Sequence, residues 1–579
     1  MEHTAHFPIE EPDPIRGMRL DFGDDRIFWF RDDLHTPYAI TPFGMSTIAR
    51  GHMWGYALAA EEAKLPPSRG ALVKTHLQRV YLGFVGIDDP AEVEARAKEF
   101  GAFIDRSIDN WQEFYHGSVE EGRQLVMAGL GVELPGMSYG ELAEHLRRSQ
   151  KVNLRCWYLH FMSMYVADTV YTIGESWVKS RGLVERDYTT LLKGFETKAL
   201  ATDRGQYLLC RSAMAKPEVL GVLESECSAS EVLLNLRDTD QGGRWLEELR
   251  DYLDIYGHRS AAAILDVNYP TWYEDPSPVL TNIRSLLTCS KAGWDFEADR
   301  RATIRSREEA IVSFRLSLNA EDRESFDANL PRWQRAYAFN EDHFFYWEQG
   351  NWSVLHYAIV EVGGRLAALG VINAADDIYQ LTLDEVLETL DCLEEAEGPA
   401  TYAYAYLLKP LIAHRTRNFE IANAEKTHAF VGRLPEAFDD PIAIKVFGIT
   451  SHVLEKAREA MAGVKGEEKT RLDGFPGSPG IVEGRARVIL DHEGFATIGT
   501  GEIMVCPYTS PAWTPVFPKI IGVVTDSGGM LTHAAISARD YGIPAVVGTW
   551  EATGLIRDGD IIRVNGNEGC VEIIERANP

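Results

Sequence analysis

The chain has 579 residues, of which 45% are hydrophobic and 25% are charged, the balance of an ordinary globular protein. This length exceeds the usual size of one hydrophobic core, so at least two domains are expected. The 58 Lys and Arg against 87 Asp and Glu leave a formal net charge of -29, which disfavours nonspecific binding to nucleic acids and anionic membranes. A site for an anion such as phosphate would therefore need a local group of positive charges or backbone N–H donors.

The cysteines and the first residues argue against an exported or membrane-spanning protein. Seven cysteines are scattered without a CxxC pair, so neither a disulfide framework nor a zinc cluster is predicted. The opening residues, MEHTAHFPIEEPDP, lack an apolar run, and no uncharged stretch of about 18 residues occurs. We expect a cytoplasmic protein that binds neither membrane nor nucleic acid.

Residues 1–460 are predicted to form a large, mainly α-helical domain. From about residue 90 onward apolar side chains recur every three or four positions, as between Val93 and Trp111 and between Leu154 and Met164. This spacing gives a helix one buried face, and it is more typical of a protein core than of a cofactor site.

Residues 461–471, MAGVKGEEKTR, are predicted to be a flexible linker because glycine and charge are concentrated there. They lack the GxxxxGK[ST] spacing of a nucleotide-binding loop. Beyond them, residues 472–579 are predicted to form a small α/β domain, because short β-rich runs alternate with turns around one helical segment, AAISARDYG. These runs are ARVIL (Ala486–Leu490), IMVC (Ile503–Cys506), IIGVVT (Ile520–Thr525), AVV (Ala545–Val547) and IIRV (Ile561–Val564).

The segment GGMLTHAAISARDYGIP (Gly528–Pro544) places a histidine at the predicted start of that helix. The preceding glycine pair permits close backbone approach, and a helix start offers free N–H groups to an anion. A neutral imidazole at such a position is a usable nucleophile near pH 7 for a phosphoryl group. The alternative is that His533 is an ordinary capping or surface residue.

The same segment resembles the phosphohistidine motif of the phosphoenolpyruvate-utilising enzymes, GGxxTHxAIxARxxGIPAVVG, and the likeness extends from about residue 472 to residue 576. This resemblance implies a swivelling domain in which His533 carries the phosphoryl group. It also implies that Gly528, Gly529 and Thr532 shape the phosphate pocket, and it assigns Arg539 to phosphate binding.

The preceding domain resembles the substrate domain of rifampicin phosphotransferases in two stretches, YGHRSAAAILDVNYPTWYEDP (Tyr256–Pro276) and GGRLAALGVINAADDIYQLTLDEV (Gly363–Val386). No ATP-grasp pattern is visible, and no pyruvate-binding barrel follows the α/β domain, so we expect neither a complete phosphoenolpyruvate synthase nor a dikinase. Two further stretches are WFRDDLHTPYAITPFG (Trp29–Gly44) and NEDHFFYWEQG (Asn340–Gly350). With these stretches, its length and its domain order, the chain as a whole resembles the larger subunit of phenylphosphate synthase and of the related methylphenyl-phosphate (p-cresol) synthase. That resemblance implies a separate ATP-grasp partner subunit that uses Mg²⁺ with ATP and releases AMP and phosphate.

On this interpretation the helical domain binds a phenolic acceptor whose hydroxyl proton must be removed. Glu341, Asp342 and His343 stand beside the aromatic run FFYW, with His343 the first choice as base and Asp342 either its orienter or the alternative base. The alternative is that the aromatic run packs while the polar residues cap a helix.

Other residues are assigned to the acceptor site. Arg259 is predicted to hold phosphoryl oxygens with help from His258, or else to fasten a turn. Trp29, Arg31 and His35 are candidates to line the acceptor pocket, although residues of these types are often structural. No metal site is assigned to the chain.

Two other functions remain open. In the first, the chain transfers the phosphoryl group to another small alcohol or to a hydroxyl of an antibiotic. In the second, the chain is a phosphocarrier or regulatory module without acceptor chemistry of its own.

Overall fold

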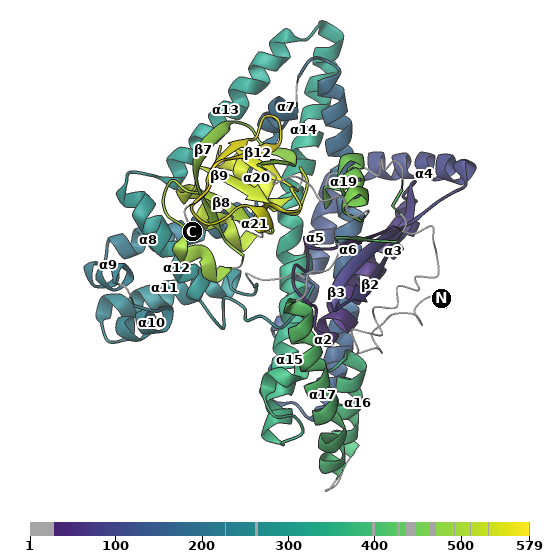
Figure 1. Cartoon of the computed structure of the whole chain (residues 1–579), viewed down its shortest axis with the longest axis vertical. Coiled ribbons are helices and arrows are strands. Elements are labelled where there is room, and N and C mark those ends of the chain that lie inside the picture. Colours follow the sequence, from purple (N-terminus) through teal and green to yellow (C-terminus); the bar gives the residue numbers. More distant parts are fainter. Residues whose placement is uncertain are drawn as a thin grey trace.

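The computed structural model shows a long helical body and a C-terminal α/β unit packed against its side (Figure 1). It describes residues 28–577 except 184, 226, 261–264, 396–399, 425–428, 433, 436–446, 462–469, 491, 510 and 531. The predicted fold class, a large mainly helical domain followed by a small α/β domain, is confirmed. Most of the predicted linker, residues 461–471, lies outside the described residues.

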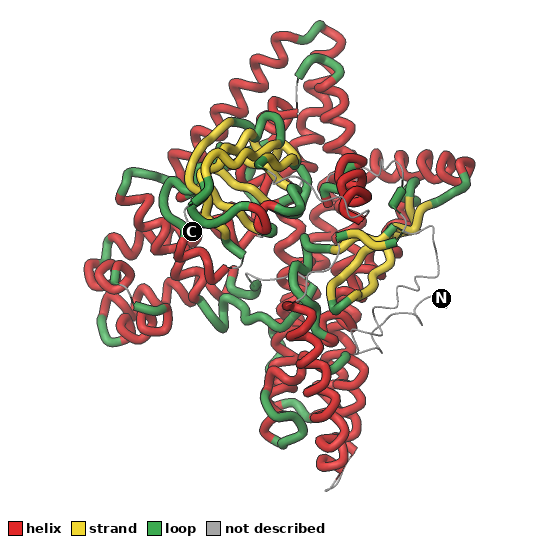
Figure 2. Tube along the Cα trace, viewed as in Figure 1, coloured by secondary structure: helices red, strands yellow, loops and turns green. Residues whose placement is uncertain are grey.

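A small antiparallel sheet lies within the body, where the sequence indicates mainly helices (Figure 2). Its strand order is β2-β3-β1-β4, and its strands are β1 (Trp29–Arg31), β2 (Ser68–His76), β3 (Arg79–Gly86) and β4 (Phe430–Val431). Phe30 stands opposite Leu82 on one side and Phe430 on the other. The sheet therefore joins the beginning of the described chain to the end of the helical body, and α3 (Arg50–Ala63) packs on it.

Long helices build the rest of the body around one large apolar core. The longest of them is α6. Ser138 and Glu141 form a capping box at the start of this helix, in which each side chain accepts a hydrogen bond from the other residue's backbone N–H. Of the predicted stripe, Phe100, Ile104 and Ile108 are buried, whereas Ala97 is exposed. The helices are α4 (Pro90–Asp109), α5 (Trp111–Leu130), α6 (Tyr139–Lys179), α7 (Glu185–Leu192), α13 (Phe296–Ser317), α14 (Ala320–His343), α15 (Asn351–Ala368), α16 (Leu383–Glu395), α17 (Ala400–Ala424) and α19 (Ser451–Met461).

A second group of helices projects from the side of the body beneath the C-terminal unit (Figure 1). It consists of α8 (Lys198–Met214), α9 (Pro217–Glu224), α10 (Ala229–Arg237), α11 (Asp240–Tyr256) and α12 (Ser277–Lys291). Short helical turns complete the body: α2 (Pro42–Gly44), η3 (Met45–Ala49), η4 (Leu134–Gly136), the π-helix η5 (Phe344–Gly350) and η6 (Ala375–Gln380). Within the described ranges no helix combines the length and the apolar character needed to cross a bilayer.

The C-terminal unit is built on one eight-stranded sheet of order β5-β12-β11-β7-β8-β9-β10-β6. Its central strands β7 to β10 run parallel, and α20 (His533–Asp540) crosses from β9 to β10. The strands are β5 (Arg471–Asp473), β6 (Phe475–Ser478), β7 (Ile481–Val488), β8 (Ile503–Cys506), β9 (Gly522–Thr525), β10 (Ala545–Val547), β11 (Ile561–Asn565) and β12 (Cys570–Glu575). The remaining turns are η7 (His492–Thr497), η8 (Pro511–Lys519) and α21 (Ala552–Leu555).

The C-terminal unit shares apolar cores with both parts of the body. Trp513 and Phe517 on η8 join one core with side chains of α8 to α12, while Ile536 on α20 joins the large core of the body. Burial of this kind stabilises by about 25 cal/mol for each Å² of apolar surface removed from water, so the unit is held in a defined docked position.

Candidate functional site

The loop before His533 contains a glycine in a conformation that other residues rarely adopt. We call residues 526–533 the His533 loop; Leu531 lies outside the described residues. Gly528 has a φ of 103°, a conformation that side chains strongly disfavour. The Thr532 hydroxyl donates to the Gly529 carbonyl at 2.8 Å and closes the turn, and α20 begins at His533. Gly528, Gly529 and Thr532 thus surround the start of α20, and their role in binding phosphate stays a prediction.

His533 is buried, with only 4% of its surface exposed, and two hydroxyl groups contact its ring. Nδ1 lies 2.9 Å from Thr509 Oγ1, and Nε2 lies 3.0 Å from Ser537 Oγ. Burial lowers the pKa of His533 to about 3, so the imidazole is neutral at physiological pH. A neutral ring nitrogen keeps the lone pair that a nucleophile needs.

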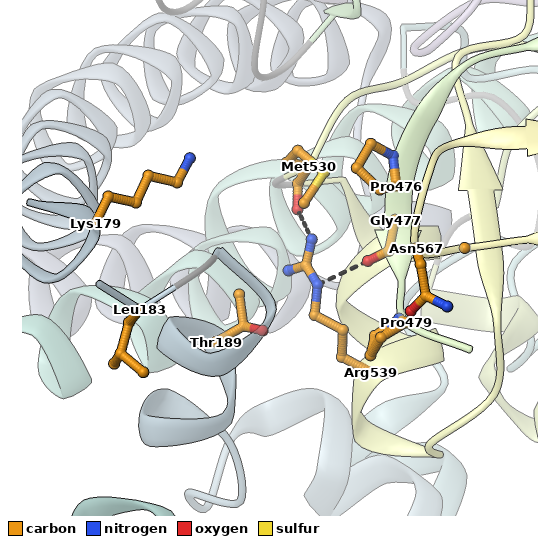
Figure 3. A pocket seen from close by; sticks show the side chains of 10 residues that line it. Lys179, Leu183, Thr189, Pro476, Gly477, Pro479, Met530, Arg539 and Asn567 are labelled. Carbon is orange, nitrogen blue, oxygen red and sulfur yellow. Dashed lines mark hydrogen bonds between the residues drawn. The ribbon is translucent and has the colours of Figure 1, made fainter. Parts of the chain in front are cut away.

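Arg539 is placed where it fastens the His533 loop to the sheet (Figure 3). Its Nε donates to the Gly477 carbonyl at 2.7 Å, and its Nη2 donates to the Met530 carbonyl. The side chain lines a pocket that Lys179 and Thr189 of the body complete from the other side. These contacts support a positioning role for Arg539, and contact with phosphate stays a prediction.

The His533 loop is docked against the end of the body that carries the small sheet. A Cβ atom placed on Gly448 would lie 2.8 Å from the Gly528 carbonyl oxygen, so the two backbones touch. The rings of Trp550 and Phe430 meet at 4.9 Å, and the Tyr38 hydroxyl donates to the Leu490 carbonyl at 2.8 Å. The C-terminal unit therefore contacts this end of the body at three places, one of which is the His533 loop.

Arg259 is a buried cation held by aromatic rings. It is 3% exposed, and its guanidinium carbon lies 4.6 Å from the ring centroid of Phe345 and 5.3 Å from that of Trp272. Burial lowers the pKa of Arg259 to about 10, so it remains charged at neutral pH. Its neighbour His258 contacts the Tyr357 hydroxyl through Nδ1 at 2.9 Å.

A series of contacts leads from Arg259 toward His533. Asp203 on α8 interacts electrostatically with Arg259 and hydrogen-bonds with Tyr541. Tyr541 packs against Phe517 at 5.8 Å, and the Phe517 ring meets the His533 ring edge-on at 6.2 Å. Arg259 is therefore connected to His533 indirectly, through Asp203, Tyr541 and Phe517.

Asp342 is held by contacts within the body. Its carboxylate accepts from the Tyr115 hydroxyl at 2.7 Å and from the Lys198 backbone N–H at 2.6 Å, and burial raises its pKa. These contacts tie α14 to α5 and to the start of α8. The side chains of Glu341 and His343 lie outside the described part of the structure. Their roles in catalysis stay predictions.

The three candidates near the start of the chain occupy different environments. Trp29 is fully buried against Tyr81 and Val431. Arg31 pairs with Asp33 in two contacts of 2.5 Å, and Asp526 of the His533 loop contributes to raising its pKa against the lowering effect of burial. His35 lines a cavity and is bonded through Nδ1 to Asp32 at 2.8 and 2.9 Å.

Comparisons with known proteins connect two segments of the chain to phosphotransfer enzymes. Residues 498–569 match the mobile domain of PEP-utilising enzymes, where PEP is phosphoenolpyruvate, and residues 159–341 match the fourth domain of rifampicin phosphotransferase. The chain carries the mobile domain of the PEP-utilising enzymes. The predicted resemblance to this family is thereby confirmed, and His533 lies within the matched mobile domain.

Three relatives show how far the likeness extends. Chondramide synthase cmdD from Chondromyces crocatus is 28% identical over 95% of this chain and 14% of its own length. The uncharacterized phosphotransferase YvkC from Bacillus subtilis is 30% identical over 67% of this chain and 43% of its own length. Rifampicin phosphotransferase from Bacillus subtilis is 29% identical over 62% of this chain and 38% of its own length. The chain thus spans less than half the length of each of these relatives.

Several side chains that contact His533 or line the cavity with His35 are not identified from the sequence alone. Ser537 stands four residues after His533, the spacing that puts both on one helix face, so a local signal was present. Thr509 comes from the segment after β8 and gave no such signal. The cavity that His35 lines, which we call the histidine cavity, also contains His52 and His160, and these three residues are too far apart in the sequence to form a motif.

Proposed function

We propose that this chain is part of a phosphotransferase in which His533 carries the phosphoryl group. The observation that supports this most directly is the neutral, buried imidazole at the first residue of α20, behind the Gly528 turn and inside the matched mobile domain. A ring nitrogen of His533 attacks the phosphorus of a donor, and the resulting phosphoimidazole then serves as the donor for an acceptor hydroxyl.

The donor half reaction requires a second protein in this proposal. An ATP-grasp partner binds Mg²⁺ with ATP, phosphorylates His533 and releases AMP and phosphate, as the resemblance to two-subunit synthases implies. In the described part of this chain no group of three or more His, Cys, Asp or Glu side chains is arranged to hold a metal ion. In this proposal the magnesium site lies on the partner, as the same resemblance implies, and the steps assigned to this chain do not involve a metal.

The acceptor half reaction transfers the phosphoryl group to a phenolic hydroxyl, as in phenol or p-cresol. Positioning and neutralisation of phosphoryl charge are the main tasks of such a site, and Arg259 is available as a buried cation for the second task. His533 is buried, and Ile536 on the same helix packs into the core of the body, so in this proposal the mobile domain must move to meet donor and acceptor in turn. The contacts between the C-terminal unit and the body are non-covalent packing contacts, which such a movement would break and remake.

A second candidate acceptor is the hydroxyl of an antibiotic or another small alcohol. The match of residues 159–341 to the fourth domain of rifampicin phosphotransferase favours it, because the segment covers much of the body that would bind the acceptor. The two candidates share the chemistry at His533 and differ only in the molecule that receives the phosphoryl group.

The test separates phosphorylation from transfer. The purified full chain is treated with phosphoramidate, a chemical donor that phosphorylates histidine without an ATP-dependent enzyme, and the modified residue is mapped by mass spectrometry. We expect acid-labile phosphate on His533 in the wild type and none there in His533→Ala. The exposed His116 supplies the matched control, since His116→Ala is expected to behave as wild type.

The phosphorylated protein is then offered phenol, p-cresol, an aliphatic alcohol or rifampicin, and products are followed by phosphorus NMR. Formation of an aryl phosphate from phenol or p-cresol supports the phenolic acceptor. Transfer only to rifampicin or the aliphatic alcohol supports the second candidate. Loss of phosphate to water alone, with every acceptor, supports a phosphocarrier without acceptor chemistry, and equal phosphorylation of His533→Ala at another residue would overturn the assignment of His533.

A further inference from the structure

The histidine cavity lies between the small sheet and the helices that cover it. Aromatic side chains form much of its wall, among them Tyr56 on α3, Phe84 on β3 and Phe161 on α6. His35, His52 and His160 supply polar groups to the same wall. An apolar, aromatic enclosure with a few convergent polar groups is the usual composition of a small-molecule site.

Asp32 fixes the orientation of His35. The Asp32 side chain is fully buried, both of its carboxylate oxygens lie within 2.9 Å of His35 Nδ1, and one also accepts from the His35 backbone N–H at 3.2 Å. A carboxylate at Nδ1 holds the proton on that nitrogen and leaves the lone pair on Nε2. His35 is therefore arranged as a proton acceptor for a molecule in the cavity.

His52 adds a polar atom that the described protein leaves unsatisfied. Its side chain is 4% exposed, its ring lies 5.3 Å from that of His35, and its Nδ1 has no hydrogen-bond partner among the described residues. Burial lowers the pKa of His52 to about 3, so this ring is neutral. A buried polar atom without a partner costs about 1–3 kcal/mol, and a bound hydroxyl would relieve that cost.

The pair formed by His160 and Glu348 makes the third polar group. His160 Nδ1 lies 3.2 Å from Glu348 Oε1. Burial raises the pKa of Glu348 to about 8, which leaves this carboxyl mostly protonated at neutral pH. The cavity therefore favours a neutral aromatic molecule with one hydroxyl group over a charged ligand.

The cavity adjoins the place where the mobile domain is docked. Phe447 lines the cavity, and its neighbour Gly448 is the residue whose backbone touches Gly528 of the His533 loop. Ile536, one turn beyond His533 on α20, packs into the same large core as the cavity wall. The His533 loop and the cavity are thus separated by one short stretch of chain.

We propose that the histidine cavity binds the phenolic acceptor and that His35, oriented by Asp32, removes the hydroxyl proton during phosphoryl transfer. This inference rests on the proposed function of His533. It moves the acceptor base from Glu341, Asp342 and His343 to His35.

Phosphoryl transfer in this proposal moves one proton and exchanges one bond. The acceptor O–H proton moves to His35 Nε2, giving an imidazolium that Asp32 stabilises. The acceptor oxygen forms a bond to phosphorus as the P–N bond to His533 breaks. The electron pair of that bond returns to the His533 nitrogen, and the other ring nitrogen of His533 keeps its proton throughout. The products are an aryl phosphate monoester, neutral His533 and protonated His35, which then releases its proton to solvent.

Occupation of the cavity requires side-chain movement. Its volume is about 40 Å³, the space of a few water molecules and less than an aromatic ring needs. Met164 lines it, and the three rotatable bonds of methionine let such a side chain vacate space at low cost. Binding of phenol is therefore expected to repack this side chain and to displace water.

The carboxyl and imidazole groups around His35 predict how transfer depends on pH. Burial lowers the pKa of His35, but the Asp32 carboxylate outweighs burial and raises this pKa above its ordinary value. His52 faces it from α3, and His160 and Asp168 of α6 line the same cavity. Transfer is expected to rise with pH as His35 loses its proton, along a limb centred above about 6.5.

The decisive variants are His35→Gln and Ala71→Phe in the full chain. His35→Gln keeps a donor toward Asp32 and removes the base, so we expect single-turnover transfer from phosphorylated His533 to p-cresol to fall about 10²- to 10⁴-fold and to lose its pH limb. Phosphoramidate charging of His533 is expected to remain at the wild-type level, as in the control His116→Gln. Binding of p-cresol, measured by calorimetry, is expected to weaken by about 10-fold at most, the worth of one hydrogen bond, which is less than the loss in transfer. Ala71→Phe fills the cavity, and we expect it to abolish p-cresol binding while His533 is still phosphorylated.

Wild-type transfer with its pH limb intact in His35→Gln would overturn the role of His35, and unchanged p-cresol affinity in Ala71→Phe would overturn the cavity. Failure of the proposed function gives a different result, namely absence of phosphate on His533 in the wild type. Binding of p-cresol to the wild type and its loss in Ala71→Phe still decide the cavity in that case. Circular dichroism and thermal unfolding of each variant distinguish a blocked cavity from an unfolded protein.

Discussion

His533 and His35 are both buried, yet their surroundings shift their pKa values in opposite directions. His533 contacts the hydroxyls of Thr509 and Ser537, and burial lowers its pKa to about 3. His35 contacts the Asp32 carboxylate, and its pKa is raised despite burial. Burial keeps the ring of His533 neutral for bond formation, whereas the Asp32 carboxylate makes His35 more basic despite burial. The two histidines therefore suit two different steps of one transfer.

The largest expected effect is the change in the free energy of unfolding with pH that protonation of His533 causes. The unfolded chain has a histidine pKa near 6.5, above the value of about 3 in the folded protein. The unfolded state therefore binds the proton first, and the free energy of unfolding falls by about 1.4 kcal/mol per pH unit as the pH drops from about 6.5 toward 3.

Urea unfolding of wild type and His533→Gln across this range measures that slope. The variant is expected to lose less stability in acid than the wild type. Asp526 and Asp540, whose pKa values burial raises to about 6, act in the opposite direction, but they are present in both proteins and cancel in the difference. Identical acid slopes in the two proteins would show that His533 is not neutral and buried as described.

The next effect comes from breaking the pair at His35. Asp32→Ala leaves His35 buried without its carboxylate, and breaking a buried pair of this kind costs about 3–5 kcal/mol. The folded pKa of His35 is raised, so its stabilisation is fully present below about pH 6.5 and is lost as the pH rises through the folded value. The destabilisation by Asp32→Ala is thus expected to be larger at pH 6 than at pH 9.

Chemical unfolding at the two pH values checks this prediction, and Asp391→Ala is its control because Asp391 pairs with Arg147 at the exposed surface. Surface pairs of this type contribute about 1 kcal/mol or less. A pH-independent loss in Asp32→Ala would contradict the difference between the two histidines.

A smaller effect tests the backbone that presents His533. Gly528→Ala places a Cβ atom 2.8 Å from the Thr532 side chain at a φ of 103°, and strain of this kind costs about 1–3 kcal/mol. We expect lower thermal stability and slower phosphorylation of His533 by phosphoramidate. Gly554→Ala on α21 is the control, since a Cβ atom there would meet nothing within 4 Å among the described residues and alanine suits a helix. Equal behaviour of the two variants would remove the argument for a required glycine.

At both sites the sequence predicts local features but not the residues that folding brings to the histidine rings. The His533 loop, α20 and the strands around them are predicted because glycine conformation, helix start and strand alternation are local properties. His35 and Asp32 stand three residues apart in RDDLHTP, so this pair left a local signal as well. Thr509, His52 and Glu348 left none, because only the folded chain brings them to the two rings.

The small sheet and the environment of Asp342 show the same limit. Pairing of Phe30 with Phe430 depends on long-range folding, and β4 is too short to stand out in a helical region. The role predicted for Asp342 rests on the neighbouring aromatic residues, yet its hydrogen bonds come from Tyr115 and Lys198 on other helices. Local patterns thus predict elements and loops, while the partners of a polar side chain follow from packing.

The smallest effect is expected from a substitution that weakens the docking of the mobile domain and leaves the histidine cavity unchanged. Tyr38→Phe removes the hydrogen bond to the Leu490 carbonyl, worth about 0.5–1.5 kcal/mol, and so weakens the docked position of the mobile domain. If docking shields His533, phosphoramidate should react about 2- to 10-fold faster with the variant, while p-cresol affinity stays the same. Tyr406→Phe on α17 is the control because Tyr406 is 82% exposed. An unchanged reaction rate in Tyr38→Phe, measured beside this control, would mean that the shielding of His533 arises inside the mobile domain, from Thr509, Ser537 and Phe517.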